Sequence, residues 1–498
     1  KNKRRYIFPA RLRPAASGRL LDRIIAQPSL RQNHRFGDVP VSASTLGAAA
    51  PRGGGRLSLI TVLAFSSTGI PLAVLALALG VFLPRYFAGE IGISLIAVGA
   101  AFTIVRLIDI AFDPIVGALM DRTRTPIGRY RPWVIGGVPV MMFGAYKLFN
   151  PPIGAGEGYL ILWLLVIYSA LSIVTLAHAA WASAIATSYD ERSRVYGWMH
   201  AVGVAGAVGL LLLPALTGGA VEPGSGDSMP TVGWIIIFGI PLTTAFCVLL
   251  SPEKVAPRNA AETFDLKEYW QALKRPEMIR LILADLALAL GPGTTAAIYV
   301  FFFHDAKAFN YAQVSILLVP FIGAGLLGAP VWAKLAQRFG KHQTLMGATV
   351  AYAVFQTILM VIPEGLFLPT ALGMFAVGFT ASAFIVLVRA MVADVGDAIR
   401  LEQGKEQAGL LYAMVTSTQK VGAAISVGII FPVLSLVGYN AADNVTNTPE
   451  AIFGLEMCYL FAPIIFVLIG GACFFGYGMN AEKHAAIRAA LDARDNAA

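Results

Sequence analysis

Residues 106–133 read RLIDIAFDPIVGALMDRTRTPIGRYRPW, and the first half of this stretch is apolar enough to lie in a bilayer. It nevertheless carries Arg106, Asp109 and Asp113. The two aspartates are four residues apart, so on a helix they lie one turn apart on the same face, which Arg106 can share. A charged residue at the centre of a membrane helix costs about 2.5–3.5 kcal/mol on insertion scales, so such residues usually face a bundle interior or a water-filled pathway.

Pro114 follows the second aspartate directly and, having no N–H, leaves the carbonyl of Ile110 without its helical partner. Two carboxylates and a freed carbonyl are hard oxygen ligands, the kind that a small cation needs. We therefore predict a cation site at Asp109 and Asp113. The alternative is that Arg106 only neutralises Asp109 and the proline only kinks the helix, which would leave Asp113 without a partner.

The composition of the whole chain indicates a membrane protein. Of its 498 residues 57% are hydrophobic and 13% are charged, and the mean hydropathy is +0.68. Soluble domains carry roughly 25% charged residues. Cys247, Cys458 and Cys473 lie in apolar segments without metal-ligand spacing, so we expect packing residues and no disulfide framework.

The first 56 residues are strongly basic. They hold twelve Lys or Arg against two acids, Asp22 and Asp38. Such a tail is able to bind anionic headgroups or nucleic acid. We instead expect a disordered cytoplasmic extension that helps to fix topology, with no nucleic-acid partner. It has no apolar core of the kind found in signal peptides.

Apolar runs of bilayer-spanning length, which takes about 20 residues, recur twelve times. They lie at 57–83, 93–120, 133–149, 159–187, 195–216, 232–250, 278–303, 313–335, 343–362, 366–392, 408–437 and 452–477. Basic residues collect in alternate loops, whereas NPPIGAGEG, TGGAVEPGSGDSMPT and GYNAADNVTNTPEA hold no Lys or Arg. By the positive-inside rule we expect a multi-pass protein of the inner (cytoplasmic) membrane with both termini in the cytoplasm.

A polar linker divides these spans six and six. A weak repeat supports two halves, because GALMDRTRTPIGR at 117–129 recurs as AKLAQRFGK at 333–341. We predict an all-α membrane protein of the major facilitator fold, with twelve transmembrane helices in two six-helix halves. The expected parts are a tail at 1–56, a half at 57–250, a linker at 251–277, a half at 278–480 and a cytoplasmic tail at 481–498.

Three blocks resemble the glycoside–pentoside–hexuronide:cation symporters of the major facilitator superfamily, the melibiose permease family. They are RLIDIAFDPIVGALMDRTRTPIGRYRPW, then DERSR at 190–194, then ADVGDAIRLEQGKEQAG at 393–409 with QKVGAA at 419–424. The resemblance spans roughly 57–480. It implies that Asp109 and Asp113 bind the coupling cation, Na⁺ or H⁺, and that Lys420 lies near them. Lys420 also stands inside an apolar run, where a buried ammonium needs carboxylates; the alternative is that it snorkels to a helix end.

The sugar-binding half of the family pattern is missing. Where the family has acids in helices 1 and 4 and an arginine in helix 5, this chain has an uncharged helix 1, Ala177 beside His178, and Met199 or Val202 beside His200. Trp181 holds the place of the aromatic residue that stacks on sugar. Trp181, His178 and His200 are therefore candidate substrate residues, although a histidine bonded to a backbone carbonyl fits His178 or His200 as well.

Asp285 in the seventh span is a further isolated acid, suited either to a substrate site or to a helix-contact hydrogen bond. Asp121, Arg122 and Arg124 are expected to latch the cytoplasmic ends of the halves, and Lys420 with Arg106 to balance the aspartates. We predict a symporter of a sugar, glycoside or related solute, monomeric, contacting membrane lipids and without cofactor. The alternatives are an amphiphilic or lipid-like cargo and, more remotely, a membrane sensor or enzyme, for which no motif such as H-E-x-x-H is present.

Overall fold

The computed structural model describes residues 57–186, 189–253, 270–271, 273–404, 408–442 and 445–495. Residues 54–484 form one compact unit that contains every candidate membrane span. The basic tail and most of the inter-half linker lie outside the described residues, as do the predictions made for them. Helix α18 (Ala481–Asp495) runs past the end of this unit and, taken by itself, is a polar helix with an Arg488–Asp492 ion pair at 3.7 Å.

The described chain is helical, with one isolated β-bridge between Thr125 and Gly128. The first group of helices is α2 (Leu59–Ser67), α3 (Gly69–Leu77), η1 (Ala78–Phe82), α4 (Leu83–Gly89), α5 (Leu95–Arg122), α6 (Arg131–Phe149), α7 (Glu157–Ile185), α8 (Tyr189–Leu211), α9 (Leu213–Leu216), η2 (Gly226–Ser228) and α10 (Met229–Leu250). The second group is α12 (Pro276–Phe301), η3 (Phe302–Ala306), α13 (Tyr311–Phe339), α14 (Lys341–Val361), α15 (Phe367–Gln403), α16 (Ala408–Leu436) and α17 (Pro449–Ala472).

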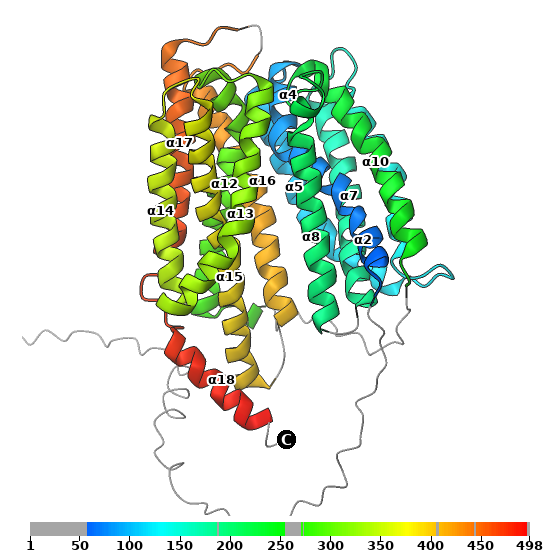
Figure 1. The fold of residues 1–498 in the computed structure, drawn as a ribbon, viewed down its shortest axis with the longest axis vertical. Coiled ribbons are helices and arrows are strands. Elements are labelled where there is room, and N and C mark those ends of the chain that lie inside the picture. The colour runs from blue at the N-terminus through cyan, green and yellow to red at the C-terminus, as the bar shows by residue number, and fades with distance from the viewer. Residues whose placement is uncertain are drawn as a thin grey trace, which may run out of the picture. The chain divides into compact units, whose positions relative to one another are not determined.

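Each group packs mainly within itself. In the first half α6 lies against α7 and α10, α5 against α7, and α8 against α2 and α3. In the second half α13 lies against α15, and α12 against α16 and α17. The halves meet mainly along α5 and α16, the blue and the orange helix near the middle of the view in Figure 1.

Eleven helical segments of the described residues are long and apolar enough to cross a membrane. The twelfth crossing is α8, which is less apolar because it begins with DERSR and carries His200 and several glycines. The predicted all-α architecture of membrane-spanning helices is thereby confirmed for the described residues. Most boundaries differ from the prediction by a few residues. The largest difference is in α15, which continues eleven residues beyond Val392 to Gln403, as a polar extension of an apolar span.

Local chemistry accounts for many helix ends. The side chains of Ser58, Ser94 and Thr448 each accept a hydrogen bond from a first-turn N–H of α2, α5 and α17, and Asn310 forms a capping box with Gln313 at the start of α13. Because consecutive spans alternate in direction, the Lys- and Arg-rich loops share one end of the unit. We call it the basic end, and the other the opposite end.

Candidate functional site

The two helix-2 aspartates and Lys420 meet where the halves touch. Lys420 of α16 pairs with Asp113 Oδ2 of α5, and its Nζ lies 3.5 Å from Asp109 Oδ2. Ser172 of α7 donates a hydrogen bond of 2.6 Å to Asp109 Oδ1. Asp109 is 3% exposed, so this carboxylate is buried and depends on these two donors. The structure thus gathers three helices from both halves around one ionic cluster.

This cluster is short of positive charge. Lys420 supplies one charge to two carboxylates, and within the residues that the structure describes Asp113 Oδ1 is buried without a hydrogen-bond partner. No ion pair between Arg106 and either aspartate is described; the Arg106 guanidinium lies over the ring of Tyr168, 4.2 Å from the centroid. A small cation would provide the charge and the coordination that the two carboxylates lack.

A tight helix contact lies on the opposite-end side of the cluster. Thr103 Oγ1 of α5 donates to the carbonyl of Ala424 in α16 at 3.0 Å. Gly428 faces the Thr103 side chain so closely that a Cβ would collide with it, and Gly99 likewise faces Phe431. Small residues on both helices let the two backbones approach, as is common between membrane helices.

Trp181 and His178 do not face open space. His178 is 2% exposed, its Nε2 lies 2.9 Å from the Phe65 carbonyl, and its ring stacks on Phe65 at 4.4 Å. Trp181 is fully buried and meets the same phenylalanine edge-on at 5.2 Å. Of the two interpretations given for His178, the structure therefore shows the histidine that is bonded to a backbone carbonyl. Trp181 fills the interior of the first half rather than a substrate surface in this conformation.

Trp181 is bonded to the start of the linker between the two halves. Its Nε1 donates to the Pro252 carbonyl at 3.3 Å, and Arg131 lies over its ring. Arg131 also donates to the Ser251 carbonyl at 2.5 Å. The Glu253 carboxylate accepts three consecutive backbone N–H groups at the start of α6, at 2.6, 2.8 and 3.2 Å. An anion at a helix N-terminus is a favourable arrangement, so the Arg-Pro-Trp motif and Trp181 anchor the linker.

The two remaining candidate substrate residues differ in setting. His200 is exposed on α8, and no hydrogen bond to it is described. Asp285 of α12 is 3% exposed and accepts a hydrogen bond of 3.3 Å from Gln419 of α16 through Oδ1. Its Oδ2 is buried and has no hydrogen-bond partner among the described residues. Asp285 therefore forms the hydrogen bond between helices that was one of the two roles expected for it. Its Oδ2 has no described partner.

The predicted latch residues lie at the basic end of α5. Arg122 and Arg124 are exposed and make no described hydrogen bond or ion pair, and the side chain of Asp121 lies outside the described part of the chain. The structure thus brings Asp109, Asp113 and Lys420 together and leaves Arg122 and Arg124 apart from the second half.

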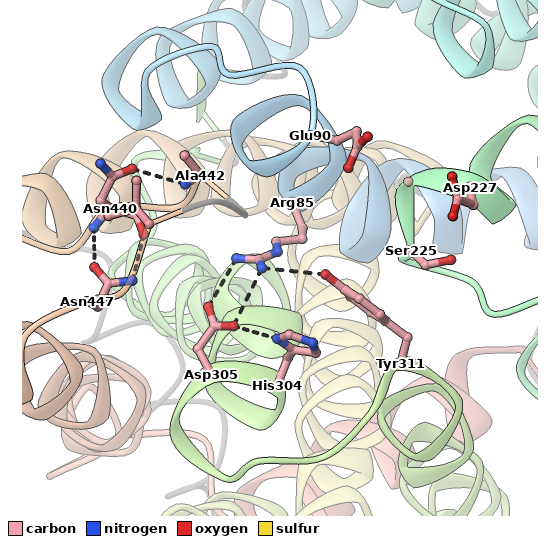
Figure 2. Close-up of a pocket in the computed structure, with 12 residues that line it drawn as sticks. Arg85, Glu90, Ser225, Asp227, His304, Asp305, Tyr311, Asn440, Ala442 and Asn447 are labelled. Carbon is pink, nitrogen blue, oxygen red and sulfur yellow. Dashed lines mark hydrogen bonds and ion pairs between the residues drawn. The ribbon is translucent and has the colours of Figure 1, made fainter.

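A second ionic cluster, which sequence reasoning missed, joins the two halves at the opposite end. Arg85 of α4 projects into the second half and bonds Asp305 Oδ2 at 3.1 Å and Oδ1 at 3.5 Å (Figure 2). It also reaches the hydroxyls of Tyr439 and Tyr311 and the Ala441 carbonyl, each within 3.5 Å. Arg85 is 4% exposed. The available signal was a charge at the end of each of two apolar runs, LPRYF and FFFHDA.

Further polar groups surround this ion pair. Tyr439 donates to Asp305 Oδ2, and His304 Nδ1 lies 2.5 Å from Asp305 Oδ1 with its ring stacked on Tyr311. Burial, followed by the charge of Asp305, raises the pKa of Tyr439, so the hydroxyl keeps its proton and remains a donor. A polar cavity of about 390 Å³ opens beside the cluster, lined from both halves (Figure 2).

Comparison with known proteins identifies the family. The model of the MFS/sugar transport protein family matches residues 64–481. The chain belongs to this family. It is a glycoside–pentoside–hexuronide:cation symporter family member of the major facilitator superfamily, as the three sequence blocks predicted.

Named relatives are carriers of several solutes. The chain is 25% identical to an isoprimeverose transporter of Lactiplantibacillus pentosus, over 80% of this chain and 82% of that one. It is 25% identical to a glucuronide carrier protein homolog of Escherichia coli (84% and 92%) and 24% identical to a sodium-dependent lysophosphatidylcholine symporter of Mus musculus (88% and 89%). The crystal structure of the nucleoside transporter NupG has the same fold, with a TM-score of 0.63 at 12% identity, over 85% of this chain and all of that chain. These findings confirm a multi-pass transporter rather than an enzyme.

Proposed function

We propose that this member of the family is a cation-coupled symporter that moves a sugar, glycoside or related small solute by alternating access. The observation that carries the proposal is the pairing of Lys420 with both Asp109 and Asp113 at the contact of the two halves. A charge cluster of this kind inside a membrane protein is costly, and it is found where ions or protons travel.

The coupling ion is Na⁺ or H⁺, bound by Asp109 and Asp113. With the ion absent, Lys420 compensates their charge and ties α16 to α5. With the ion bound, the carboxylates no longer need the ammonium, and this tie weakens. An ion shifts a conformational equilibrium only by its difference in affinity between the two states. Breaking or making an inter-half ion pair supplies such a difference.

The same geometry indicates to which side of the membrane the described conformation is closed. The basic end faces the cytoplasm, following the positive-inside rule, and the protein lies in the inner membrane with both termini cytoplasmic. Arg85 and the contact of Gly428 with Thr103 then join the halves on the extracytoplasmic side. We infer a conformation closed to the outside. Asp121, Arg122 and Arg124 act as the cytoplasmic latch in the alternate state.

Uptake into proteoliposomes tests the proposal. Purified protein is reconstituted, and uptake of isoprimeverose, a glucuronide and lysophosphatidylcholine is measured under an imposed Na⁺ or H⁺ gradient. Collapsing one gradient at a time with a sodium ionophore or a protonophore identifies the ion. Gradient-driven uptake that is lost in Asp113→Asn supports coupling at this site. Uptake that ignores both gradients contradicts it.

A lipid-like cargo is the second candidate. It is favoured by the similarity to the sodium-dependent lysophosphatidylcholine symporter over 88% of the chain, and by a first helix without the acid that holds sugar in the family. The lysophosphatidylcholine arm of the uptake experiment separates the two cargoes. The ring nitrogens of Trp181 and His178 are bonded to backbone carbonyls, whereas His200 is exposed and Asp285 keeps an oxygen without a described partner, so His200 and Asp285 are the better substrate candidates of the four.

A further inference from the structure

Asp285 has an unexplained oxygen close to the ion cluster. It lies on α12 and is 3% exposed; Oδ1 accepts from Gln419, and Oδ2 is buried without a hydrogen-bond partner in the described part of the chain. An unsatisfied buried polar atom is costly, and more so when it is charged. A contact that served only to pin two helices together would need one oxygen. The second oxygen therefore calls for a donor that arrives in another state of the protein.

The neighbouring helix already carries such a donor. Gln419 and Lys420 are adjacent on α16, and they project to different sides: Gln419 to α12 and Lys420 to α5. The helices α12 and α16 are in close contact one turn further on, where a Cβ added to Gly422 would lie 2.6 Å from Ala289 Cβ. Lysine has a flexible four-carbon stem and three donors, so modest rotation of its side chain changes its partner.

A cation bound between Asp109 and Asp113 would displace the Lys420 ammonium, because two positive charges repel one another over the same oxygens. The displaced ammonium stays within the membrane span and again needs an anion. Arg106 on α5 and Arg389 on α15 are cations and cannot pair with an ammonium. Arg389 lies close enough to Asp285 to act on its charge, but no hydrogen bond or ion pair between these two side chains is described. Asp285 is the acid that α16 already touches on its other side.

We propose that Asp285 is the second partner of Lys420, the carboxylate that receives the ammonium when a cation occupies the helix-2 aspartates. This role rests on the proposed cation symport and adds a positioning residue to it. With Asp113, Lys420 links the two halves; with Asp285, it is paired inside its own half. Cation binding would in this way break the ion pair between Lys420 of α16 and Asp113 of α5 without leaving a buried charge unpaired.

A mutant cycle on thermal unfolding tests the exchange without any cation. The combined Asp109→Asn and Asp113→Asn background imitates aspartates whose charge has been neutralised. Lys420 should then depend on Asp285. Asp285→Asn is expected to lower the melting temperature more in this background than in the wild type, and the excess should vanish when Lys420→Ala is added. Asp285→Glu, which keeps the carboxylate, should retain the coupling.

Asp394→Asn is the matched control. Asp394 is an acid of α15 at the basic end, paired with Lys341 at 2.5 Å and with His484 at 3.2 Å. Its replacement should lower the melting temperature equally in both backgrounds. An equal effect of Asp285→Asn in the two backgrounds would overturn the proposal and leave Asp285 as a helix contact.

The cation titration provides a second readout. In Asp285→Asn the displaced ammonium has nowhere to go, so the cation concentration for half-maximal stabilisation should rise by about tenfold, within the usual range of coupling between sites. A wild type that responds to no metal cation excludes sodium as the coupling ion, and the mutant cycle then decides the role of Asp285 by itself. A wild type that responds, with an unshifted Asp285→Asn, keeps the ion site and removes the role of Asp285.

Discussion

Arg85 and Asp305 are 220 residues apart in the chain, yet their side chains form an ion pair at 3.1 Å that joins the two halves at the opposite end. Arg85 comes from the first half, and the side chains and carbonyl that surround it come from the second. An arginine with a planar, always charged guanidinium is suited to such a multi-acceptor socket. In the proposed outward-closed conformation, this socket is the contact that holds the opposite end shut.

Arg85→Ala should open this end. Breaking a buried pair by removing one partner costs about 3–5 kcal/mol, which is as large as the few kcal/mol that separate two conformations. The measurement is labelling of Ser225→Cys, beside the cavity, by a membrane-impermeant maleimide after replacement of the three native cysteines. The rate should rise several-fold. Arg85→Lys keeps the positive charge but not the planar guanidinium, and should give an intermediate labelling rate. An unchanged labelling rate in Arg85→Ala would show that the socket does not hold this end closed.

Gly428→Ala tests the contact between α5 and α16. The added methyl group would meet the Thr103 hydroxyl, and overpacking of this kind costs about 1–3 kcal/mol. We expect a lower melting temperature, restored in part by Thr103→Ala, which makes room. Gly347→Ala is the control, because nothing lies within 4 Å of the position of its Cβ. Equal effects at the two glycines would argue against a tight interface.

Trp181→Ala separates a packing role from a substrate role. Trp181 is fully buried and bonded to the linker, so its truncation should cost about 3–5 kcal/mol of stability. Any solute uptake that remains should keep the wild-type KM. Glu253→Gln should also lower the stability, since it removes the negative charge at the N-terminus of α6. A Trp181→Phe variant with normal melting temperature and a strongly raised KM would instead place the ring on the substrate.

Tyr439 makes the opposite-end socket sensitive to alkali. Its pKa in the folded protein is raised, first by burial and then by Asp305, from an ordinary value of about 10. The folded protein therefore holds a proton that the unfolded chain loses above about pH 10, so this contribution to stability is complete below that pH and falls above it. The difference in melting temperature between wild type and Tyr439→Phe should be constant from pH 7 to 9 and narrow near pH 10.5. A difference that widens would refute this assignment.

Site residues could be predicted from the sequence where a charged residue interrupts an apolar run. Asp109, Asp113 and Lys420 were singled out on this basis, and the structure places them together. The spans were found because bilayer thickness dictates their length. The polar end of α15 was missed for the same reason, since a helix that continues into water leaves no apolar signal.

Contacts between distant segments were beyond sequence reasoning. Arg85 and Asp305 each lie at the end of an apolar run, where a charge needs no special explanation. Trp181 occupies the family's place for a sugar-stacking residue, but a motif position does not fix which way a ring points. The linker carbonyl of Pro252, which decides the matter, lies 71 residues away. Such directions follow from packing rather than from local pattern.

Thermal unfolding of the purified protein in detergent tests the central claim most directly. The melting temperature is measured in Na⁺, Li⁺ or K⁺ at constant ionic strength, for wild type, Asp109→Asn and Asp113→Asn. A ligand that binds only the folded state stabilises it by RT ln(1 + [L]/Kd), about 2.7 kcal/mol at a hundredfold excess over Kd. If the aspartates bind sodium, Na⁺ raises the wild-type melting temperature above its value in K⁺, and both variants lose the response. A sodium response that persists in both variants would contradict the assignment of the cation site to Asp109 and Asp113.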